Sequence, residues 1–318
     1  MNPPIFTLTG KRVYVAGHKG TVGAAILRRL ASEGCEIVTA DRSVLDLTRR
    51  EETHRWLQKM KPDAVFLPAA RVGGIHANAS FPVEFLADNL AIAVNVIGGA
   101  HAVEVKKLLF FGSSCIYPKQ APQPMTEDML LSGPLEPTNE CYAIAKISAI
   151  KLCAAYRHQF GADFISVMPT NIYGPGDNYH PEHSHVPAAL IRRFHEAKTA
   201  GLSTVSVWGS GTPRREFLAV DDLADASVFV MKHYSDDGFI NVGTGEDISI
   251  SEFARLVAEV VGYRGQLVWD HSRPDGAPRK LLDISKLATL GWRAKIPLRA
   301  GLEAAYKDFL AGGGRYRG

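Results

Sequence analysis

The apolar residues in the first half of the chain follow two different periods. Short runs rich in Val, Ile, Leu and Phe predict buried strands, and longer segments with apolar residues three or four apart predict helices packed on one face. Buried strands are expected at residues 12–16, 36–40, 64–67, 107–111 and 164–168. Helices are expected at residues 24–32, 51–60, 82–103 and 142–160. This alternation predicts right-handed crossovers and a mostly parallel sheet that helices cover on both faces.

The pattern is less regular beyond residue 175, where residues 177–185 are polar, rich in His and Pro, and typical of a loop. Further helices are expected at residues 187–199, 221–231, 251–261 and 298–310, and further strands at 205–208, 239–242 and 266–269. We therefore expect an α/β fold with a doubly wound Rossmann domain in residues 1–175 and a return segment near 215–240. A smaller α/β substrate-binding lobe is expected mainly in residues 176–318.

The composition is that of a folded globular protein. The 318 residues suffice for two domains of about 150 residues each, and 46% hydrophobic and 22% charged residues exclude disordered and fibrous proteins. The net charge of +3 is too small to favour a nucleic acid or a membrane surface as a partner, although it suits a chain that handles phosphates. No run of eighteen uncharged apolar residues and no charged leader is present, so neither a membrane span nor a signal peptide is expected.

The four cysteines predict reduced thiols in a cytoplasmic protein. None of them has metal-ligand spacing, so no metal site is expected; they are Cys35, Cys115, Cys141 and Cys153.

Three glycines follow the first expected strand and open the first expected helix. The segment runs Gly17-His18-Lys19-Gly20-Thr21-Val22-Gly23. Glycine permits the tight turn and lets the backbone approach a pyrophosphate that rests on the helix N-terminus. The segment predicts a dinucleotide site, and the alternative is a connection that only packs the helix on the strand.

An acidic and a basic residue, Asp41 and Arg42, follow the second expected strand, where the charge distinguishes the two nicotinamide cofactors. An acidic residue there can bind the ribose 2′-hydroxyl of NAD, and a basic residue accommodates the 2′-phosphate of NADP. Lys19 and Arg42 are cations, and Asp41 opposes them. We expect NADP(H), with NAD as the alternative; Asp41 can also point away and cap a turn.

Tyr142 and Lys146 are four residues apart and share one face of the expected helix. An ammonium beside a phenol favours the phenolate, and lowering a tyrosine pKa from the usual 10 to 7 takes about 4 kcal/mol. Ser113, at the C-terminal end of the fourth expected strand, can hydrogen-bond the same substrate oxygen, because ligands collect at that edge of a parallel sheet. The three residues predict a reductase site. The alternative is a core tyrosine beside a lysine whose stem is buried.

Cys115 and His185 suggest a second reaction beside reduction. Cys115 lies two residues after Ser113, and His185 ends the polar loop. If the substrate is a ketone, a base on one face and an acid on the other can invert a carbon next to the carbonyl. The alternatives are that Cys115 is a buried loop thiol and that His180 or His183 takes the place of His185.

Six motifs spread over nearly the whole chain resemble the GDP-L-fucose synthase family of extended short-chain dehydrogenases/reductases. They lie at residues 17–23, 112–118, 136–140, 142–146, 168–175 and 208–213. The runs Ser-Ser-Cys-Ile-Tyr-Pro at 113–118 and Pro-Thr-Asn-Ile-Tyr-Gly-Pro at 169–175, with Ser184-His185-Val186, are much more specific than the glycine loop.

The resemblance implies NADPH-dependent conversion of GDP-4-keto-6-deoxy-D-mannose to GDP-L-fucose, by 3,5-epimerisation and then 4-reduction, in a homodimer. Ser113, Tyr142 and Lys146 would be the reductase triad, and Cys115 and His185 would exchange the protons of epimerisation. Residues expected to bind the cofactor are Gly17, His18, Lys19, Gly20, Thr21, Val22, Gly23, Asp41, Arg42, Phe111, Gly112, Ser114, Lys146, Pro169, Thr170, Asn171, Ile172 and His185. Residues expected to contact the GDP-sugar are Arg193, Trp208, Arg215, Asp275 and Arg279.

The chain departs from the family at Lys19, where Arg is more usual, and at Asp41, where a neutral residue is expected. Lysine is a point charge, so it grips a 2′-phosphate less firmly than arginine. Related alternatives are a 4-epimerase, a 4,6-dehydratase and a GDP-colitose synthase; a dehydratase typically has an Asp-Glu pair where this chain has Cys115-Ile116. A non-catalytic NADP sensor typically loses the Tyr or the Lys that this chain keeps.

Overall fold

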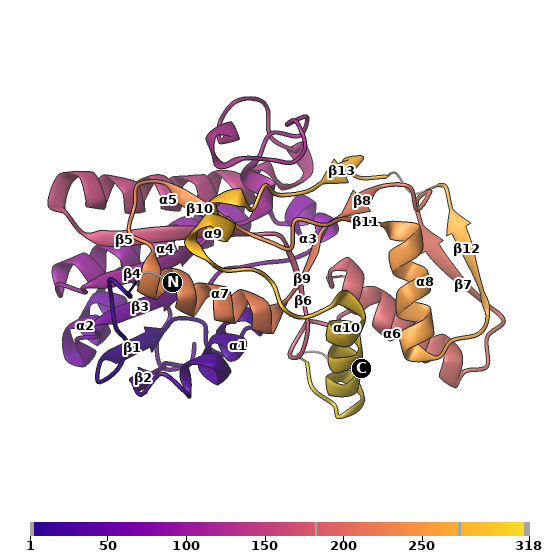
Figure 1. The fold of residues 1–318 in the computed structure, drawn as a ribbon, viewed down its shortest axis with the longest axis horizontal. Coiled ribbons are helices and arrows are strands. Elements are labelled where there is room, and N and C mark those ends of the chain that lie inside the picture. The colour runs from indigo at the N-terminus through magenta and orange to yellow at the C-terminus, as the bar shows by residue number, and fades with distance from the viewer. Residues whose placement is uncertain (1–2, 182, 273–274, 315–318) are drawn as a thin grey trace.

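The computed structural model describes residues 3–181, 183–272 and 275–314 (Figure 1). A six-stranded parallel sheet organises the larger part of the chain, in the order β10-β5-β4-β3-β1-β2. Its strands are β1 (Arg12–Val15), β2 (Glu36–Val38), β3 (Ala64–Leu67), β4 (Lys107–Phe111), β5 (Asp163–Pro169) and β10 (Phe239–Val242). From β1 the chain runs to β2 on one side and then to β3 on the other, so the sheet is doubly wound and the expected fold class is confirmed.

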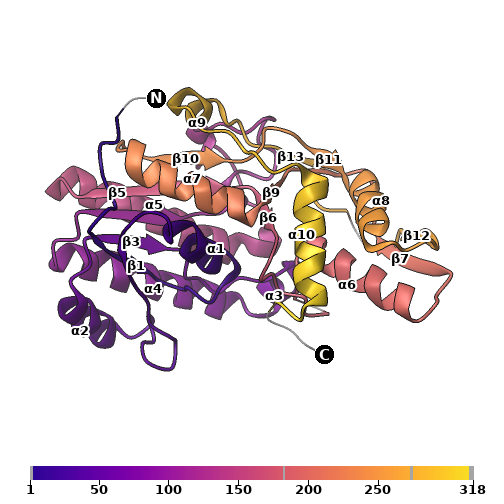
Figure 2. The ribbon, with the colours of Figure 1, turned by 60° about the horizontal axis from the view of Figure 1, so that its bottom comes forward.

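Helices cover both faces of this sheet (Figure 2). The helices on one face are α1 (Thr21–Leu30) and α7 (Val220–His233). Those on the other face are α2 (Arg50–Met60), α4 (Pro82–Ala102) and α5 (Glu140–Phe160). These bounds agree closely with the expected ones, except that α1 begins earlier, at Thr21 inside the glycine loop.

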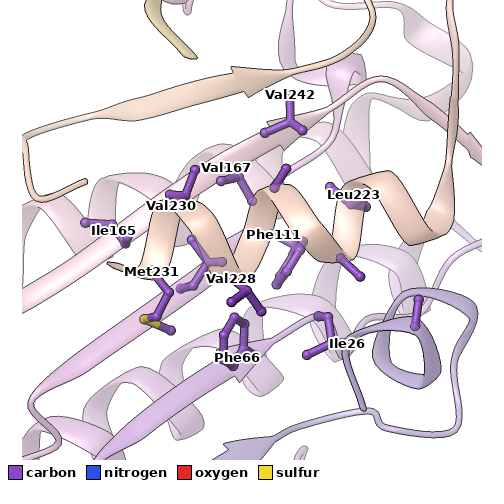
Figure 3. Packing of buried hydrophobic residues seen from close by; sticks show 14 of the residues in the cluster. Ile26, Phe66, Phe111, Ile165, Val167, Leu223, Val228, Val230, Met231 and Val242 are labelled. Atoms are coloured by element: carbon purple, nitrogen blue, oxygen red, sulfur yellow. The ribbon is translucent and has the colours of Figure 1, made fainter. Parts of the chain in front are cut away.

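Strand side chains point alternately to the two faces, as the pleat of a strand requires. Phe66 of β3 belongs to the core under α1 and α7, whereas its neighbours Val65 and Leu67 belong to the core under α4 and α5. Figure 3 shows Val228 pointing from α7 toward Phe66. Because both faces are buried, the strands read as continuous apolar runs, which is why the sequence reveals them.

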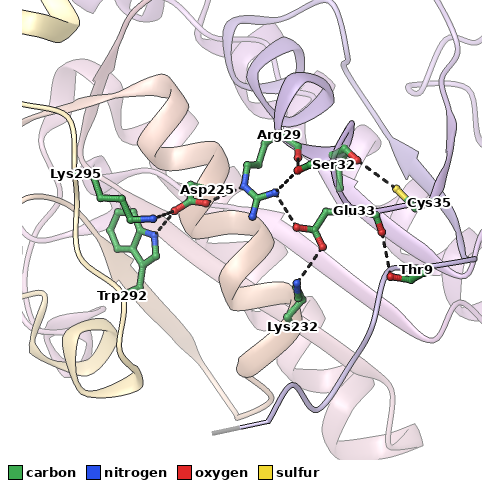
Figure 4. A network of polar contacts seen from close by, with 10 residues as sticks. Thr9, Arg29, Ser32, Glu33, Cys35, Asp225, Lys232, Trp292 and Lys295 are labelled. Carbon is green, nitrogen blue, oxygen red and sulfur yellow. Dashed lines mark hydrogen bonds and ion pairs between the residues drawn. The ribbon is translucent and has the colours of Figure 1, made fainter. Parts of the chain in front are cut away.

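A network of charges fixes α7 to α1 at the edge of this core (Figure 4). The Arg29 guanidinium of α1 lies 2.8 Å from an Asp225 oxygen of α7 and 2.7 Å from Glu33, and Lys232 reaches Glu33 at 3.0 Å. Hydrogen bonds from Arg29 and Lys295 outweigh burial and lower the pKa of Asp225 to about 2. The network holds the segment after residue 215 against the helix that the glycine loop opens.

The remaining elements form a smaller lobe with its own core, which contains Phe194, Phe253 and Leu302. Its longer elements are α6 (Val186–Thr199), β7 (Thr204–Trp208), α8 (Ile250–Val261), β12 (Gln266–Asp270) and α10 (Leu298–Leu310). β7 and β12 pair in parallel, and α6 and α8 pack beside them (Figure 1). Strand β10 lies in the main sheet although it follows β7 in the chain, and the expected division at residue 175 with a return near 215–240 stays a prediction.

Several short elements were not expected from the pattern of apolar residues. They are α3 (Ile75–Ser80), η1 (Ser114–Ile116), η2 (Glu127–Met129), η3 (Pro137–Asn139), β6 (Asn171–Tyr173), β8 (Arg214–Arg215), β9 (Phe217–Ala219), β11 (Ile248–Ser249), β13 (Arg279–Lys280) and α9 (Ser285–Leu290). Elements of two to six residues carry too little periodicity to be recognised.

Helix α4 is long and apolar enough to cross a membrane by length and composition alone, although no uninterrupted run of eighteen apolar residues was found in the sequence. Within the protein it packs against α2 and α5 and buries 44% of its most apolar window. Packing of this kind also requires an apolar helix, so the composition is weak evidence for a membrane.

Candidate active site

The glycine loop lies between β1 and α1 at the carboxyl edge of the sheet. Gly17 has a φ of +88°, and a Cβ added there would lie 2.8 Å from the Ala69 Cα in the loop after β3. A Cβ added at Gly23 would lie 2.2 Å from the Gly17 carbonyl oxygen. Both positions therefore require glycine, one for the turn and one for the close approach of α1 to the loop.

The loop fits the diphosphate of a dinucleotide. Gly20 is the N-cap residue of α1, so the amide groups of the first turn face the loop and favour an anion there. The site also lies between β1 and β3, where the sheet reverses its strand order and where such folds bind ligands. The buried Nδ1 atom of His18 has no hydrogen-bond partner among the described residues, which leaves a polar contact to be made by a ligand.

Asp41 is paired with the two basic side chains of the loop. Its carboxylate lies 2.8 Å from the Lys19 Nζ and 3.1 Å from the His18 Nε2. The hydrogen bond from Lys19 is the main reason why the pKa of Asp41 lies below its ordinary value. Arg42 follows it and is exposed. The loop cation and the strand carboxylate therefore neutralise each other in this structure.

The loop after β4 and the start of α5 bring Ser113, Cys115 and Tyr142 together. The Ser113 side chain lies beside both Tyr142 and Cys115 and lowers the pKa of each. Cys115 lies in η1, which packs against α5, and only 7% of its surface is exposed. The three side chains therefore share one small site at the carboxyl end of β4.

Lys146 lies one turn below Tyr142 on α5 and is buried. Its Nζ atom donates a hydrogen bond of 2.7 Å to the Phe111 carbonyl oxygen and lies 5.7 Å from the centre of the Tyr142 ring. Burial lowers the pKa of Lys146 to about 8. The cation is thus fixed beside the tyrosine by the last residue of β4.

The expected lowering of the Tyr142 pKa depends on Lys146 and on the charge of the bound nicotinamide ring, and the protein alone shows the opposite direction. Burial raises that pKa, and the nearby Cys115 raises it further, while the hydrogen bond with Ser113 lowers it. Loss of water around a phenolate outweighs what a single neighbouring group supplies. Tyr142 is therefore a neutral phenol here, which is the form that can donate a proton.

Burial also raises the pKa of the Cys115 thiol, against four interactions that lower it, the smallest of which comes from its own backbone. The three largest are, in decreasing order, the interaction with Ser113 and the charges of Lys280 and Lys146. A thiol acts as a base only in its thiolate form, and nearby cations favour that form. The sequence pattern does not point to Lys280; in the same stretch it predicts Asp275 and Arg279 as substrate contacts.

Residues expected beside the nicotinamide lie along the ends of β4 and β5. A Cβ added at Gly112 would lie 2.4 Å from the Met168 Cε, so glycine is required there. Thr170 and Asn171 donate side-chain hydrogen bonds to the Glu216 carbonyl oxygen, at 3.3 and 2.8 Å. The other expected residues of this group lie at the same edge and are Phe111, Ser114, Pro169 and Ile172.

Glu216 is a supporting residue that the sequence did not reveal. Its side chain is fully buried and accepts hydrogen bonds from the amides of Thr244, Gly245 and Leu282, at 2.6, 2.8 and 3.0 Å. Burial raises the pKa of this carboxyl. Glu216 therefore joins the loop after β10, the segment after β13 and, through its carbonyl, the end of β5.

His185 is the N-cap residue of α6 and is exposed. The backbone of the loop before it approaches Gly74, because a Cβ added at Gly74 would lie 3.5 Å from the Ser184 carbonyl oxygen. The rings of His180 and His183 stack at 4.4 Å. Which of the three histidines faces Cys115 stays a prediction.

The residues expected to hold the GDP-sugar lie on the smaller lobe. The Arg193 guanidinium lies 5.7 Å from the centre of the Trp208 indole, of which 59% is exposed. Asp275 accepts hydrogen bonds from the Ser210 amide and hydroxyl, at 2.9 and 2.6 Å. Arg215 is partly buried, and the negative charge of Asp275 raises its pKa against the effect of burial.

Arg279 is in a different environment from Arg215. Its guanidinium pairs with Asp247, which Arg214 also contacts at 2.7 Å. Among the described residues, no group of three His, Cys, Asp or Glu side chains could hold a metal ion.

Comparison with known proteins gives the family. The model of the NAD dependent epimerase/dehydratase family matches residues 13–243. A GDP-L-fucose synthase of Sinorhizobium fredii is 56% identical, over 97% of this chain and 98% of its own, and one of Escherichia coli is 52% identical, over 98% and 100%. A GDP-L-colitose synthase of Yersinia pseudotuberculosis is 38% identical, over 94% and 98%.

Solved structures agree with this result. A crystal structure of a GDP-L-fucose synthetase from Naegleria fowleri bound to NADP superposes with a TM-score of 0.89 at 27% identity, over 98% of each chain. By sequence and by structure, the chain belongs to the NAD dependent epimerase/dehydratase family, in the branch of the GDP-L-fucose synthases.

Proposed function

We propose that this protein converts GDP-4-keto-6-deoxy-D-mannose to GDP-L-fucose with NADPH, by epimerisation at C3 and C5 followed by reduction at C4. The observation that carries the proposal is the position of Ser113 beside both Tyr142 and Cys115, where it lowers the pKa of each. A single serine thus joins the group suited to reduction and the group suited to epimerisation. Both reactions place charge on the same C4 oxygen, so one site serves both.

Epimerisation needs a base and an acid on opposite faces of the sugar. In the proposed step one of Cys115 and His185 removes the proton from the carbon next to the ketone, and the C–H electron pair moves into an enolate. Ser113 and Tyr142 hydrogen-bond the enolate oxygen, which stabilises its charge. The other residue returns a proton from the opposite face, which inverts the carbon.

Reduction needs a proton donor at the C4 oxygen. Bound NADPH supplies the hydride to C4. Tyr142 donates the proton to the oxygen, and its raised pKa keeps that proton available before the reaction. Lys146, fixed by the Phe111 carbonyl, then stabilises the phenolate until water restores the proton.

The GDP part of the substrate binds on the smaller lobe in this proposal. Arg193 and Arg215 contact the phosphates, since guanidinium groups match phosphate geometry, and the exposed Trp208 indole forms an apolar wall. Asp275 and Arg279 close the nucleotide pocket. Asp275 is already held by Ser210, and Arg279 by Asp247.

We also propose a homodimer in the cytoplasm, built on α4 and α5. These helices pack side by side, yet Val83 and Val94 of α4 and Ile144 of α5 are 72%, 52% and 41% exposed. Exposed apolar residues on two neighbouring helices favour a protein interface, and a second copy completes a four-helix arrangement.

The runner-up is a GDP-colitose synthase, which reduces the 3-deoxy analogue of the keto-sugar and inverts C5 only. The higher identity with the fucose synthases favours the first proposal. Incubation with NADPH and each keto-sugar, followed by NMR of the product, tests both. Faster turnover of the 3-hydroxylated substrate to GDP-L-fucose supports the proposal, and a preference for the 3-deoxy substrate contradicts it.

A further inference from the structure

Helix α10 of the smaller lobe lies along the segment that continues from β6 (Figure 2). The Tyr173 hydroxyl donates a hydrogen bond of 3.2 Å to the Leu298 carbonyl oxygen at the start of the helix. The Tyr179 hydroxyl donates one of 3.2 Å to the Ala305 carbonyl oxygen, two turns further along. Both tyrosines are buried in the core of the smaller lobe. Residues 173–179 are therefore held against α10 at both ends.

Between these two tyrosines, Gly176 forms one hydrogen bond with each lobe. Its amide donates to the Asp308 carboxylate of α10 at 2.8 Å. Its carbonyl oxygen accepts a hydrogen bond of 3.0 Å from the Thr21 hydroxyl. Thr21 is the first residue of α1 and belongs to the glycine loop. One backbone residue thus connects a side chain of the smaller lobe to the loop that fits the cofactor diphosphate.

The turn that ends α10 packs closely around Asp308. The Gly313 amide donates to the Asp308 carbonyl oxygen at 2.8 Å, and a Cβ added at Gly313 would lie 2.3 Å from the Asp308 Oδ1. A Cβ added at Gly314 would lie 2.9 Å from the carbonyl oxygen of Asp177, the residue after Gly176. Only glycine lets the backbone approach this closely, and the turn limits the space for other orientations of the carboxylate.

We propose that Asp308 is a positioning residue for the cofactor: by holding the Gly176 amide it fixes the carbonyl that holds Thr21, and with it the first turn of α1 on which the diphosphate rests. The amides of that turn bind an anion best when their orientation is fixed in advance. Asp308 acts only through Gly176 and Thr21 and does not itself touch the cofactor. The inference goes beyond the proposed reaction, because it concerns the affinity of the glycine loop and not the chemistry of the sugar.

The charge of Asp308 distinguishes positioning from a direct effect. A carboxylate that acted on the diphosphate through its charge would repel it, so removal of that charge would strengthen NADPH binding. Loss of a positioning contact weakens NADPH binding instead. The two explanations therefore predict opposite changes in the dissociation constant for the same substitution.

The test measures the Kd of NADPH from the fluorescence of the bound dihydronicotinamide, with the full-length protein and no sugar present. Asp308→Ala removes the acceptor of the Gly176 amide and is expected to raise Kd about fivefold. Asp308→Asn removes the charge but keeps an acceptor, so its Kd should stay within about twofold of the wild type. Glu303→Ala, at an exposed acidic residue of the same helix, is the matched control and should leave Kd unchanged.

A double-mutant cycle tests the route through Gly176. Thr21→Val removes the hydroxyl with little change in shape and should also raise Kd. Adding Asp308→Ala to this variant should raise Kd by less than about a further twofold, because both changes interrupt the same connection. Thermal unfolding of each variant without cofactor separates loss of folding from loss of affinity, and Asp308→Ser is the second truncation should the Ala variant fold poorly.

An unchanged or lower Kd in the truncated variants overturns the inference. So do effects of Asp308→Ala and Thr21→Val that multiply fully in the double variant, since the two residues would then act separately. Because only NADPH binding is measured, the outcome is independent of epimerisation and reduction of the sugar.

Discussion

The Lys146 ammonium donates a 2.7 Å hydrogen bond to the Phe111 carbonyl oxygen. This bond joins α5 to the end of β4 and fixes a buried cation next to Tyr142. The protein therefore keeps a charge inside its core at a cost in stability, which is expected where a buried charge serves a reaction.

The cost predicts how stability depends on pH. The pKa of Lys146 is about 8 in the folded protein and has the ordinary value of 10.5 when unfolded, so the unfolded chain binds more protons between these values and stability rises with pH there. The destabilisation is fully present below pH 8 and amounts to about 3 kcal/mol. The unfolding free energies of wild type and Lys146→Met are measured by urea titration from pH 7.5 to 10.5. Over this range the stability of the wild type relative to the variant should increase by that amount. A constant difference would show that Lys146 is not perturbed.

The position of Asp41 beside Lys19 predicts how strongly the enzyme prefers NADPH over NADH. In Asp41→Asn the carboxylate no longer repels a 2′-phosphate or pairs with Lys19, so the ratio of kcat/KM for NADPH to that for NADH should increase about fivefold. Lys19→Met should lower the same ratio, and Glu51→Gln, an exposed acidic residue at the start of α2, should leave it unchanged. A fall in the ratio for Asp41→Asn would mean that this carboxylate does not oppose NADPH.

Glu216 predicts a link between stability and the geometry of the site. Glu216→Ala leaves three backbone amides without their acceptor and opens a cavity, so the unfolding free energy should fall by at least about 2 kcal/mol. The exposed Glu246 in the same turn is the control, and Glu246→Ala should change stability by less than about 0.5 kcal/mol. Equal changes in the unfolding free energy for the two substitutions, measured by chemical denaturation, would show that Glu216 does not support the site.

The dimer prediction uses the exposed apolar residues of α4 and α5. Val94→Glu and Ile144→Glu should each convert the dimer to a monomer in analytical ultracentrifugation, because a charge at a packed interface stays unpaired. Leu202→Glu, at an exposed apolar residue between α6 and β7, should keep the dimer. A wild-type protein that sediments as a monomer would contradict the prediction outright.

The sequence predicts the long elements because their periodicity is strong, and α10 begins and ends where the pattern indicates. It also predicts Ser113, Cys115, Tyr142 and Lys146, since they follow β4 or lie one turn apart on α5. It does not reveal Glu216, because only the folded chain brings the amides of Thr244, Gly245 and Leu282 to that carboxylate. It also does not reveal that burial raises the Tyr142 pKa in the protein alone, because residue spacing indicates a neighbouring charge but not the loss of water.

The central claim is that the site joining Tyr142 to Cys115 performs both epimerisation and reduction. Product formed from GDP-4-keto-6-deoxy-D-mannose and NADPH in deuterated water is analysed by NMR for the wild type and for Cys115→Ser. The wild type should give GDP-L-fucose with deuterium at C3 and C5. The variant should still oxidise NADPH but epimerise at least about 100-fold more slowly. Unchanged turnover of Cys115→Ser to the same deuterated product would contradict the account.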